Sequence, residues 1–208
     1  FRDTPHGVFC AHHYRYSPGM STFLVEVSDA TWQRAGFEQM SPEATIAWCE
    51  QVFAKDLGGH PILSNNSHWR QFPAIWNERW SFDHVVLMGD ALRTAHFSIG
   101  SGTRLAMEDA VALFKAFRET SGAPDVQAAL ARYQSLRQPP MKKIWDAANV
   151  SLRWYEHMDG HMAMDPVDFA YSYMTRTGRV SHAELRRRDP GLAAAYERLH
   201  PEIAQPQD

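Results

Sequence analysis

Residues 89–110 combine residue types that could bind a cofactor, in the order GDALRTAHFSIGSGTRLAMEDA. Asp90 directly follows the short apolar run 85–88, which the sequence predicts to be a strand buried on both faces. The carboxyl ends of buried strands are where α/β folds bind ligands. An ionised carboxylate at such a position can accept two hydroxyl hydrogen bonds, which suits a sugar or another polyol.

Two glycines and a predicted helix start follow Asp90. Gly100 and Gly102 let the backbone approach a flat ligand closely, because no Cβ stands in the way. The next helix start exposes unpaired N–H groups with partial positive charge, which favour an anion or an electron-rich oxygen. Reduced flavin fits these features: its ribityl hydroxyls would meet Asp90, and its N1–C2=O edge would face the amides near Gly102, Thr103 and Arg104. The structural alternative is a plain strand-end turn followed by a generic glycine loop.

The segment resembles the second flavin-binding motif of the class A flavoprotein monooxygenases, the para-hydroxybenzoate hydroxylase type. Those enzymes usually show Gly-Asp-Ala-Ala-His, then Pro-Pro, a glycine loop, Asn, and Asp-Ala on the helix. The matching residues here are Gly89, Asp90, Ala91, Gly100, Gly102, Asp109 and Ala110. The resemblance implies that Asp90 binds the ribityl chain, and that the amides of Thr103 and Arg104 hold the flavin C2 carbonyl. The departures are His96-Phe97 for Pro-Pro, Arg104 for the Asn and Arg93 for the His.

Residues 96–103 are similar to a subgroup of this family, the flavin domains that act on salicylyl-CoA and 2-aminobenzoyl-CoA and the tryptophan-derivative hydroxylases of violacein biosynthesis. Residues 12–26 resemble their substrate-sheet hairpin. Residues 169–177 resemble the tail that leads, in the acyl-CoA enzymes, into a second flavin domain of old-yellow-enzyme type. We therefore expect the chain to lie closest to the salicylyl-CoA 5-hydroxylase and 2-aminobenzoyl-CoA monooxygenase flavin domains.

The resemblance implies an aromatic hydroxylase that uses FAD, with NADH or NADPH as reductant, and acts through a flavin C4a-hydroperoxide. Its implied substrate is an aryl-CoA thioester such as salicylyl-CoA or 2-aminobenzoyl-CoA. One alternative is a hydroxylase of a free indolic or phenolic compound. Another is a non-catalytic helical interaction module in which the flavin motif is vestigial.

His96 is the residue expected to be catalytic. It would lie near the reacting edge of the flavin, where a neutral imidazole could orient a phenol, an aniline or the hydroperoxide. Packing in place of the absent proline is the alternative. Arg93 and Arg104 could meet phosphates of FAD or CoA through bidentate contacts, or they could lie in solvent.

The hairpin region offers further candidates. His12 and His13 are neighbours on a predicted strand, so their side chains point to opposite faces and at most one can face a pocket. A plain strand histidine is the favoured interpretation of either. Tyr14 and Tyr16 share a face, where they could line an aromatic pocket, although core packing is the favoured interpretation.

The elements that must position these residues can be predicted from local patterns. Two strand-like runs flank a Pro-Gly turn, which predicts a hairpin. Ser41 is placed to cap the start of a helix, and a Gly-Gly pair ends that helix. Pro139 and Pro140 must kink or break a later helix. The predicted strands are 8–16, 21–27, 85–88 and short ones near 69–72 and 76–80; the predicted helices run from Ser41 to Gly58, over 105–117, and from about Val126, Asp165, Ser181 and Asp189.

The predicted fold is α/β, as an α+β fragment with a substrate-side β-sheet, the Gly-Asp flavin motif and C-terminal helices. No Gly-x-Gly-x-x-Gly is present, so we expect the N-terminal Rossmann part to be largely missing. The expected domains are 1–150 (1–84 substrate-side sheet and helix, 85–120 Gly-Asp motif, 121–150 C-terminal helix) and 151–208, a helical tail and linker toward a downstream domain. The chain does not begin with Met, so we expect a piece of a longer protein that is inactive alone.

Composition argues against several other classes. The 21 basic and 24 acidic residues give a net charge of −3, which offers no general footprint for nucleic acid, although Arg186, Arg187 and Arg188 could form a local patch. Cys10 and Cys49 cannot form a disulfide framework and lack metal-ligand spacing, so we expect no metal and a cytoplasmic location. No apolar run is long enough for a membrane span. The expected partner is a small, CoA-linked aromatic substrate, and a homodimer is left open.

Overall fold

The computed structural model describes residues 1–119 and 125–204, which divide into two compact units. The first unit contains residues 1–70, 154–172 and 195–204, and the second contains residues 71–119, 125–153 and 173–194. Each unit is therefore assembled from segments that lie far apart in the sequence. The predicted mixture of helices and sheet is confirmed. Among the described residues, no helix combines the length and the apolar character needed to cross a membrane.

The first unit is built on an antiparallel sheet with the strand order β1 (Arg2–Thr4), β2 (Gly7–Ser17), β3 (Met20–Glu26). Pro18 and Gly19 form the two-residue connection between β2 and β3, because Ser17 pairs with Met20. The predicted hairpin is therefore confirmed. Successive β2 side chains alternate between faces. Phe9 and Ala11 join an apolar core on one face, whereas Cys10 and His12 lie on the other.

Helices α1 (Asp29–Ala35), α2 (Pro42–Val52) and α3 (Ala54–Leu57) complete this part of the first unit. The Ser41 hydroxyl accepts the Ala44 N–H at 3.2 Å, so the predicted helix start is confirmed. The predicted single helix is divided at Phe53, whose backbone leaves helical geometry while its side chain enters the core. Helix α1 was not predicted, although Ser28 caps its first turn and the left-handed Gly36 ends it.

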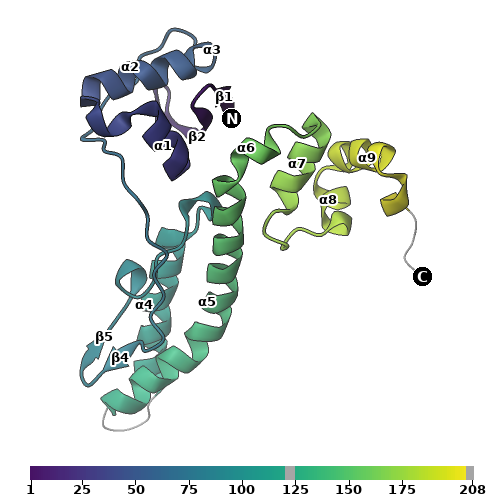
Figure 1. Cartoon of the computed structure of the whole chain (residues 1–208). Helices are drawn as coiled ribbons and strands as arrows, with labels where there is room; N and C mark the ends of the chain where they lie inside the picture. The colour runs from purple at the N-terminus through teal and green to yellow at the C-terminus, as the bar shows by residue number, and fades with distance from the viewer. Residues whose placement is uncertain (120–124, 205–208) are drawn as a thin grey trace. The chain divides into compact units, whose positions relative to one another are not determined.

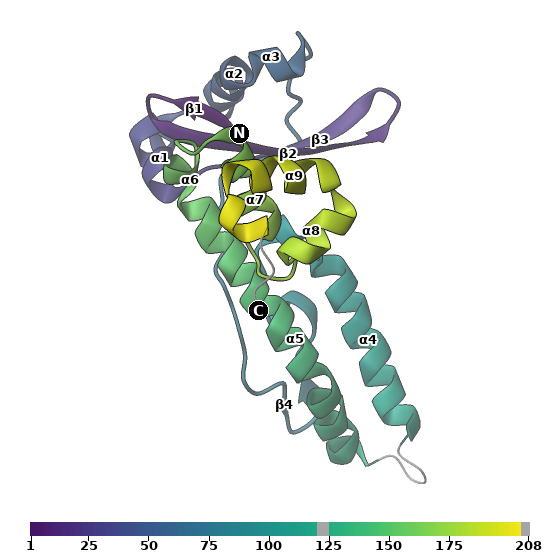
Figure 2. The same ribbon diagram turned by 90° about the vertical axis from the view of Figure 1, so that its right-hand side faces the viewer.

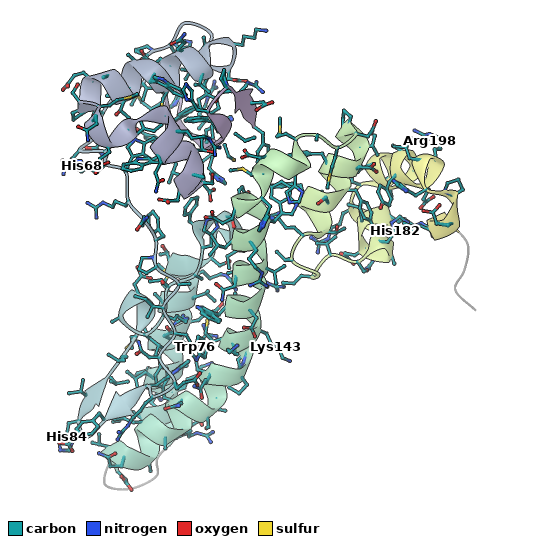
Figure 3. All side chains as sticks on the ribbon, viewed as in Figure 1. His68, Trp76, His84, Lys143, His182 and Arg198 are labelled. Carbon is teal, nitrogen blue, oxygen red and sulfur yellow. The ribbon has the colours of Figure 1, made fainter. Side chains whose placement is uncertain are left out.

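Besides residues 173–194 of the tail, whose helices are described below, the second unit contains a small hairpin, short 3-10 turns and long helices. The elements between residues 71 and 156 are β4 (Ser81–Phe82), β5 (Val85–Val86), η2 (Gly89–Ala91), η3 (Phe97–Ile99), α4 (Gly102–Glu119) and α5 (Val126–Glu156). Helices α4 and α5 lie side by side in both views (Figures 1 and 2). Their buried residues form the core of this unit together with Trp80 and Leu92. Trp76 lies beside α5 (Figure 3), where its ring centroid is 5.4 Å from that of Trp145.

The strand predicted at 85–88 is present over Val85–Val86, but its expected burial on both faces is wrong, and the short strands predicted near 69–72 and 76–80 are wrong as well. The run 85–88 is not buried on both faces: in the described part of the chain Val85–Val86 pairs only with Ser81–Phe82, and Val85 is 63% exposed. His84 stands at the exposed tip of this hairpin (Figure 3). Residues 69–72 and 76–80 form no strand, and Trp76 makes only an isolated bridge to Arg93. The aromatic residues of 76–80 serve core packing instead, as the fully buried Trp80 shows.

Helix α5 passes through Pro139 and Pro140 without a break. Figure 1 shows that α5 bends in its N-terminal half, which agrees with the kink that was one of the two predicted outcomes. The helix survives because only the two proline N–H groups are lost, while its long flanking stretches keep their hydrogen bonds and pack on the core.

The predicted helical tail is present as α6 (Met158–His161), α7 (Pro166–Thr175), α8 (His182–Arg188), α9 (Pro190–Leu199) and the turn η4 (Pro201–Ala204). The starts predicted at Asp165, Ser181 and Asp189 are confirmed. Ser181 accepts the Glu184 N–H at 3.1 Å, as expected of an N-cap. Of the linker expected over 200–206, residues 201–204 form the turn η4, and the rest from 205 lies outside the described residues.

Candidate functional site

The Gly89-Asp90 turn is fastened to helix α4. Gly89 has a φ of +57°, which favours glycine, and a Cβ added there would lie 3.4 Å from the Cβ of Ala106. Its N–H donates to Oδ2 of Asp109 at 3.2 Å. Both partners belong to the first turns of α4, so the turn that carries Asp90 lies against the beginning of that helix.

Asp109 is the buried anchor of this arrangement. Its carboxylate is fully buried, and Oδ2 also accepts from Arg93 at 2.7 Å, while Oδ1 accepts from Nε of Arg137 at 2.9 Å. Two guanidinium groups therefore neutralise one buried carboxylate, which would otherwise be costly to remove from water. Both interpretations of Arg93, phosphate binding and solvent exposure, are wrong, because it is 4% exposed and paired with Asp109.

Burial also changes the acidity of a neighbouring phenol. Tyr133 on α5 is fully buried in the same core. Loss of water around it raises the pKa of the Tyr133 hydroxyl, and the negative charge of Asp109 raises this pKa further, while Arg93 and Arg137 oppose the effect. Tyr133 therefore stays neutral and belongs to the support of the turn rather than to the acid–base chemistry of a site.

The Asp90 carboxylate is exposed, and it makes no hydrogen bond or ion pair within residues 1–119 and 125–204. The first amide of α4 with a backbone acceptor is that of Leu105, which donates to the carbonyl of Ser101, the residue before the helix, at 2.9 Å. The amides of Gly102, Thr103 and Arg104 precede it and have no acceptor in the described part of the chain. The turn and the helix start thus offer an unpartnered carboxylate and unpartnered amides.

The glycine loop between them exposes backbone that no side chain covers at its two glycines. Gly100 has a φ of +60°, and a Cβ added at Gly100 or at Gly102 would meet no atom within 4 Å. A carboxylate acceptor, amide donors and an open glycine surface match a ligand that carries hydroxyl groups and an electron-rich carbonyl. FAD is such a ligand, so the donor set of this chain fits its ribityl and ring portions. Of Arg93 and Arg104, which were predicted either to meet phosphates or to lie in solvent, Arg104 has its side chain on the surface, where it pairs with Glu108 at 2.7 Å.

His96 begins the short turn η3 and is partly buried. Its Nδ1 lies 2.7 Å from Oγ of Ser98 and accepts the Ser98 N–H at 3.4 Å, and its ring stacks on that of Phe97. The structure therefore places His96 on the same loop as Gly100, between the Asp90 turn and the start of α4. Ser98 is held in turn by Ser151 of α5, a contact that no local sequence pattern could reveal.

The hairpin of the first unit gathers a second set of polar side chains. His12 and His13 point to opposite faces, as predicted: Nε2 of His12 lies 2.7 Å from Oε2 of Glu26 and 3.6 Å from Sγ of Cys10, whereas His13 stacks on Phe23. The sulfur, imidazole and carboxylate atoms all lie within 4.8 Å of one another. Spacing along the chain could not indicate this cluster, because Glu26 comes from the opposite strand.

Tyr14 and Tyr16 do not pack in a core. They are 66% and 60% exposed, so the favoured interpretation is wrong, and pocket lining stays a prediction. The pattern of two aromatic residues on one face of a strand cannot distinguish a buried pair from an exposed one.

Comparison with known proteins identifies the family. The FAD binding domain family matches residues 13–148. A salicyloyl-CoA 5-hydroxylase from a Streptomyces species is 40% identical over 205 residues, covering 94% of this chain and 38% of the relative. A 3-hydroxy-4-methyl-anthranilyl-[aryl-carrier protein] 5-monooxygenase from Streptosporangium sibiricum is 40% identical over 184 residues, covering 88% and 47%. A protodeoxyviolaceinate monooxygenase from Chromobacterium violaceum is 37% identical over 177 residues, covering 85% and 47%.

The chain spans less than half the length of each of these curated relatives. The family match nevertheless covers more than half of this chain and includes the Gly89-Asp90 turn, the glycine loop and helix α4. The chain therefore belongs to the FAD binding domain family, as the resemblance of residues 89–110 to a flavin motif predicts, and FAD is the cofactor of that family.

Proposed function

We propose that the protein to which this chain belongs is an FAD-dependent aromatic hydroxylase, and that Asp90 and the amides of Gly102, Thr103 and Arg104 bind the flavin. One observation carries the proposal: an unpartnered carboxylate sits on a turn tied to α4 through Asp109, and the amides at the start of α4 are also unpartnered. When bound, FAD supplies the redox chemistry that transfers oxygen to an aromatic ring. NADH or NADPH is the proposed reductant.

In this proposal each group of the chain has a separate task. The Asp90 carboxylate accepts hydrogen bonds from the ribityl hydroxyls. The amides at the beginning of α4 donate to the C2 carbonyl edge, where the positive end of the helix dipole favours negative charge. Gly100 and Gly102 allow the ring to approach the backbone without meeting a Cβ. His96, on the same loop, lies near the reacting edge of the flavin and orients the group that reacts there.

The names of the relatives support a substrate class. Two of the three specify an aromatic acyl group joined to a carrier, CoA in one and an aryl-carrier protein in the other. We therefore propose a carrier-linked aryl acyl group as the substrate. The protodeoxyviolaceinate enzyme favours the second candidate, a hydroxylase of a free indolic compound. Turnover of an aryl-CoA thioester, measured beside turnover of the free acid, distinguishes the two.

The cofactor assignment is tested with Asp90→Ala in the intact protein. Because hydrogen bonds to a charged group contribute about 1.5–3 kcal/mol, the dissociation constant for FAD should rise about 10- to 100-fold. Equilibrium dialysis measures this change, and circular dichroism should show unchanged thermal unfolding. Asp146→Ala is the matched control, because Asp146 is an exposed carboxylate of the same unit that pairs with Lys142 on the surface of α5. FAD retention at the original level in Asp90→Ala would contradict the assignment.

A further inference from the structure

A chain of four hydrogen-bonded side chains runs from the loop of the candidate site into the helices that follow it. Nδ1 of His96 lies 2.7 Å from Oγ of Ser98, which lies 2.8 Å from Oγ of Ser151. Nε of Arg176 donates to that same Ser151 oxygen at 2.9 Å. All four residues belong to the second unit. Arg176 comes just after α7, in the segment 151–208 that the sequence predicts to be a helical tail.

Other contacts fix the guanidinium of Arg176 at the far end of this chain. Its NH1 donates to the Tyr173 carbonyl at 2.6 Å, and its NH2 donates to the Ser98 carbonyl at 3.4 Å. Its central carbon lies 4.2 Å from the centre of the Tyr173 ring. Arg176 therefore holds both the backbone of the His96 loop and, through Ser151, the side chain of Ser98.

The direction of the chain follows from the donor properties of its members. An arginine side chain carries only donors, so Ser151 must accept from Arg176. Ser151 is fully buried, and within residues 1–119 and 125–204 its hydroxyl hydrogen has one acceptor, Oγ of Ser98. The Ser98 hydrogen is then left for Nδ1 of His96. Each hydroxyl donates once and accepts once in this arrangement.

The reverse direction conflicts with two observations. It would place a hydrogen on Nδ1 of His96, although the backbone N–H of Ser98 already points at that atom at 3.4 Å. It would also leave the buried hydroxyl hydrogen of Ser151 without an acceptor in the described part of the chain. Buried polar hydrogens are almost always hydrogen-bonded, since leaving one unpaired is costly. The contacts therefore put two donors on Nδ1 and the ring hydrogen on Nε2.

We propose that Ser98, Ser151 and Arg176 are positioning residues that hold His96 as the neutral Nε2–H tautomer, so that His96 acts on its partner as a hydrogen-bond donor and not as a base. The role of His96 as a donor rests on the proposed flavin site, whereas the assignment of its tautomer does not. A fixed donor suits an oxygen atom of the aromatic substrate or of the flavin system. It cannot remove a proton from a phenol or an aniline, which narrows the roles expected of His96.

The test is NMR of the intact protein with ¹⁵N-labelled histidine, in which the two ring nitrogens of a neutral histidine have distinct shifts. The chain has 11 histidines, so His96→Gln identifies the signals of His96. At a pH where the ring is neutral, the hydrogen should be found on Nε2. A hydrogen on Nδ1 would overturn the proposal with no other variant needed, and this readout does not depend on flavin binding or on turnover.

Variants then test the positioning residues. Ser151→Ala and Arg176→Gln should each give His96 a mixture of tautomers and lower kcat about tenfold or more, while the dissociation constant for FAD stays unchanged. Arg176→Lys, which keeps a charged donor, should restore part of both readouts. The matched control is Ser135→Ala, because Ser135 is an exposed serine of the same helix α5. A pure Nε2–H tautomer in both Ser151→Ala and Arg176→Gln would contradict the proposal.

The outcomes also separate this inference from the proposed function. If Asp90→Ala retains FAD while His96 is the Nε2–H tautomer and responds to Ser151→Ala, the flavin assignment fails and the positioning chain stands. If FAD binding depends on Asp90 but His96 carries its hydrogen on Nδ1, the positioning chain fails and the flavin assignment stands.

Discussion

The Asp109 carboxylate joins helix α4 to the Gly89–Arg93 segment before it and to Arg137 on α5. Its helix neighbour Glu108 also contacts Arg137 at 2.7 Å, so the Arg137 guanidinium bridges two carboxylates. Because Asp109 is fully buried, its charge is screened little by water, and each guanidinium depends on it for neutralisation. The position of Asp90 thus depends on a side chain that itself is not expected to touch the flavin.

Asp109→Asn keeps the shape of the side chain but removes the charge. The variant leaves Arg93 buried without its anionic partner, so the free energy of unfolding should fall by about 3–5 kcal/mol. Urea unfolding followed by circular dichroism measures the loss. Asp146→Asn, at the exposed Lys142 pair, should lose less than about 1 kcal/mol. An Asp109→Asn variant as stable as this control would mean that the buried ion pairs do not hold the turn.

Residues of the candidate site could be predicted from sequence where local geometry identifies them. Asp90, Gly100 and Gly102 follow from a strand end, a glycine loop and a helix start that are adjacent along the chain. Arg137, Ser151 and Arg176 could not be predicted, because each reaches the site region from a helix or loop 28 or more positions away. Surface and buried arginines also look alike in sequence, which explains the wrong interpretations of Arg93.

At the scale of elements, helix starts were the most predictable features. Ser41, Ser181 and the Asp-Pro pairs act through hydrogen bonds to amides two or three residues later, and such contacts depend only on local sequence. Strands were less predictable, because pairing depends on distant partners. Residues 85–88 have the composition of a buried strand, but they pair over only two residues. The prediction of the β2–β3 hairpin is confirmed because its turn and both strands are contiguous in the sequence.

Helix α5 gives a prediction at this scale. Pro139 and Pro140 are exposed on the helix, so replacing both with alanine removes no core side chain. Alanine restores two backbone N–H donors to the helix and relieves the proline ring contacts, so the free energy of unfolding should rise by about 1–3 kcal/mol. Urea unfolding, with Ser135→Ala of the same helix as reference, measures the change. A loss of stability would instead show that the packing of α5 requires the bend.

At the scale of the whole molecule, the tail helices join elements that the linear order of the chain separates. In the first unit the Val8 N–H donates to Asp159 at 3.1 Å, and the Phe1 ring lies 5.8 Å from that of Trp154. Within the tail itself, the Tyr171 and Tyr196 rings stack at 3.5 Å and His200 contacts Asp168 at 2.6 Å. No local pattern of the sequence indicates such pairings. The predicted division into domains 1–150 and 151–208 stays a prediction.

Two histidines of the first unit should make its stability depend on pH in opposite senses. The hydrogen bond to Asp168 raises the pKa of His200, so this contact stabilises the folded state fully below the unfolded pKa and is lost as pH rises through the folded pKa. Burial, together with the charge of His157, lowers the pKa of His161, whose ring stacks on Trp154. The stabilising contribution of neutral His161 is therefore present above the unfolded pKa and lost as pH falls through the folded pKa.

Glutamine substitutions separate the two effects, since Gln does not titrate in this range. Thermal unfolding of His200→Gln should show a deficit relative to the parent protein at about pH 6 that shrinks toward about pH 8.5, because the unfolded histidine titrates near pH 6.5. The deficit of His161→Gln should instead grow as pH rises over the same interval. Each variant thus serves as the control for the other, because any general effect of pH on the fold would move both deficits in one direction. If the deficits of both variants changed with pH in the same direction, neither contact would be linked to protonation. The stacked Tyr171 and Tyr196 rings would then be the contact between α7 and α9 that holds these segments together, instead of the charge on His200.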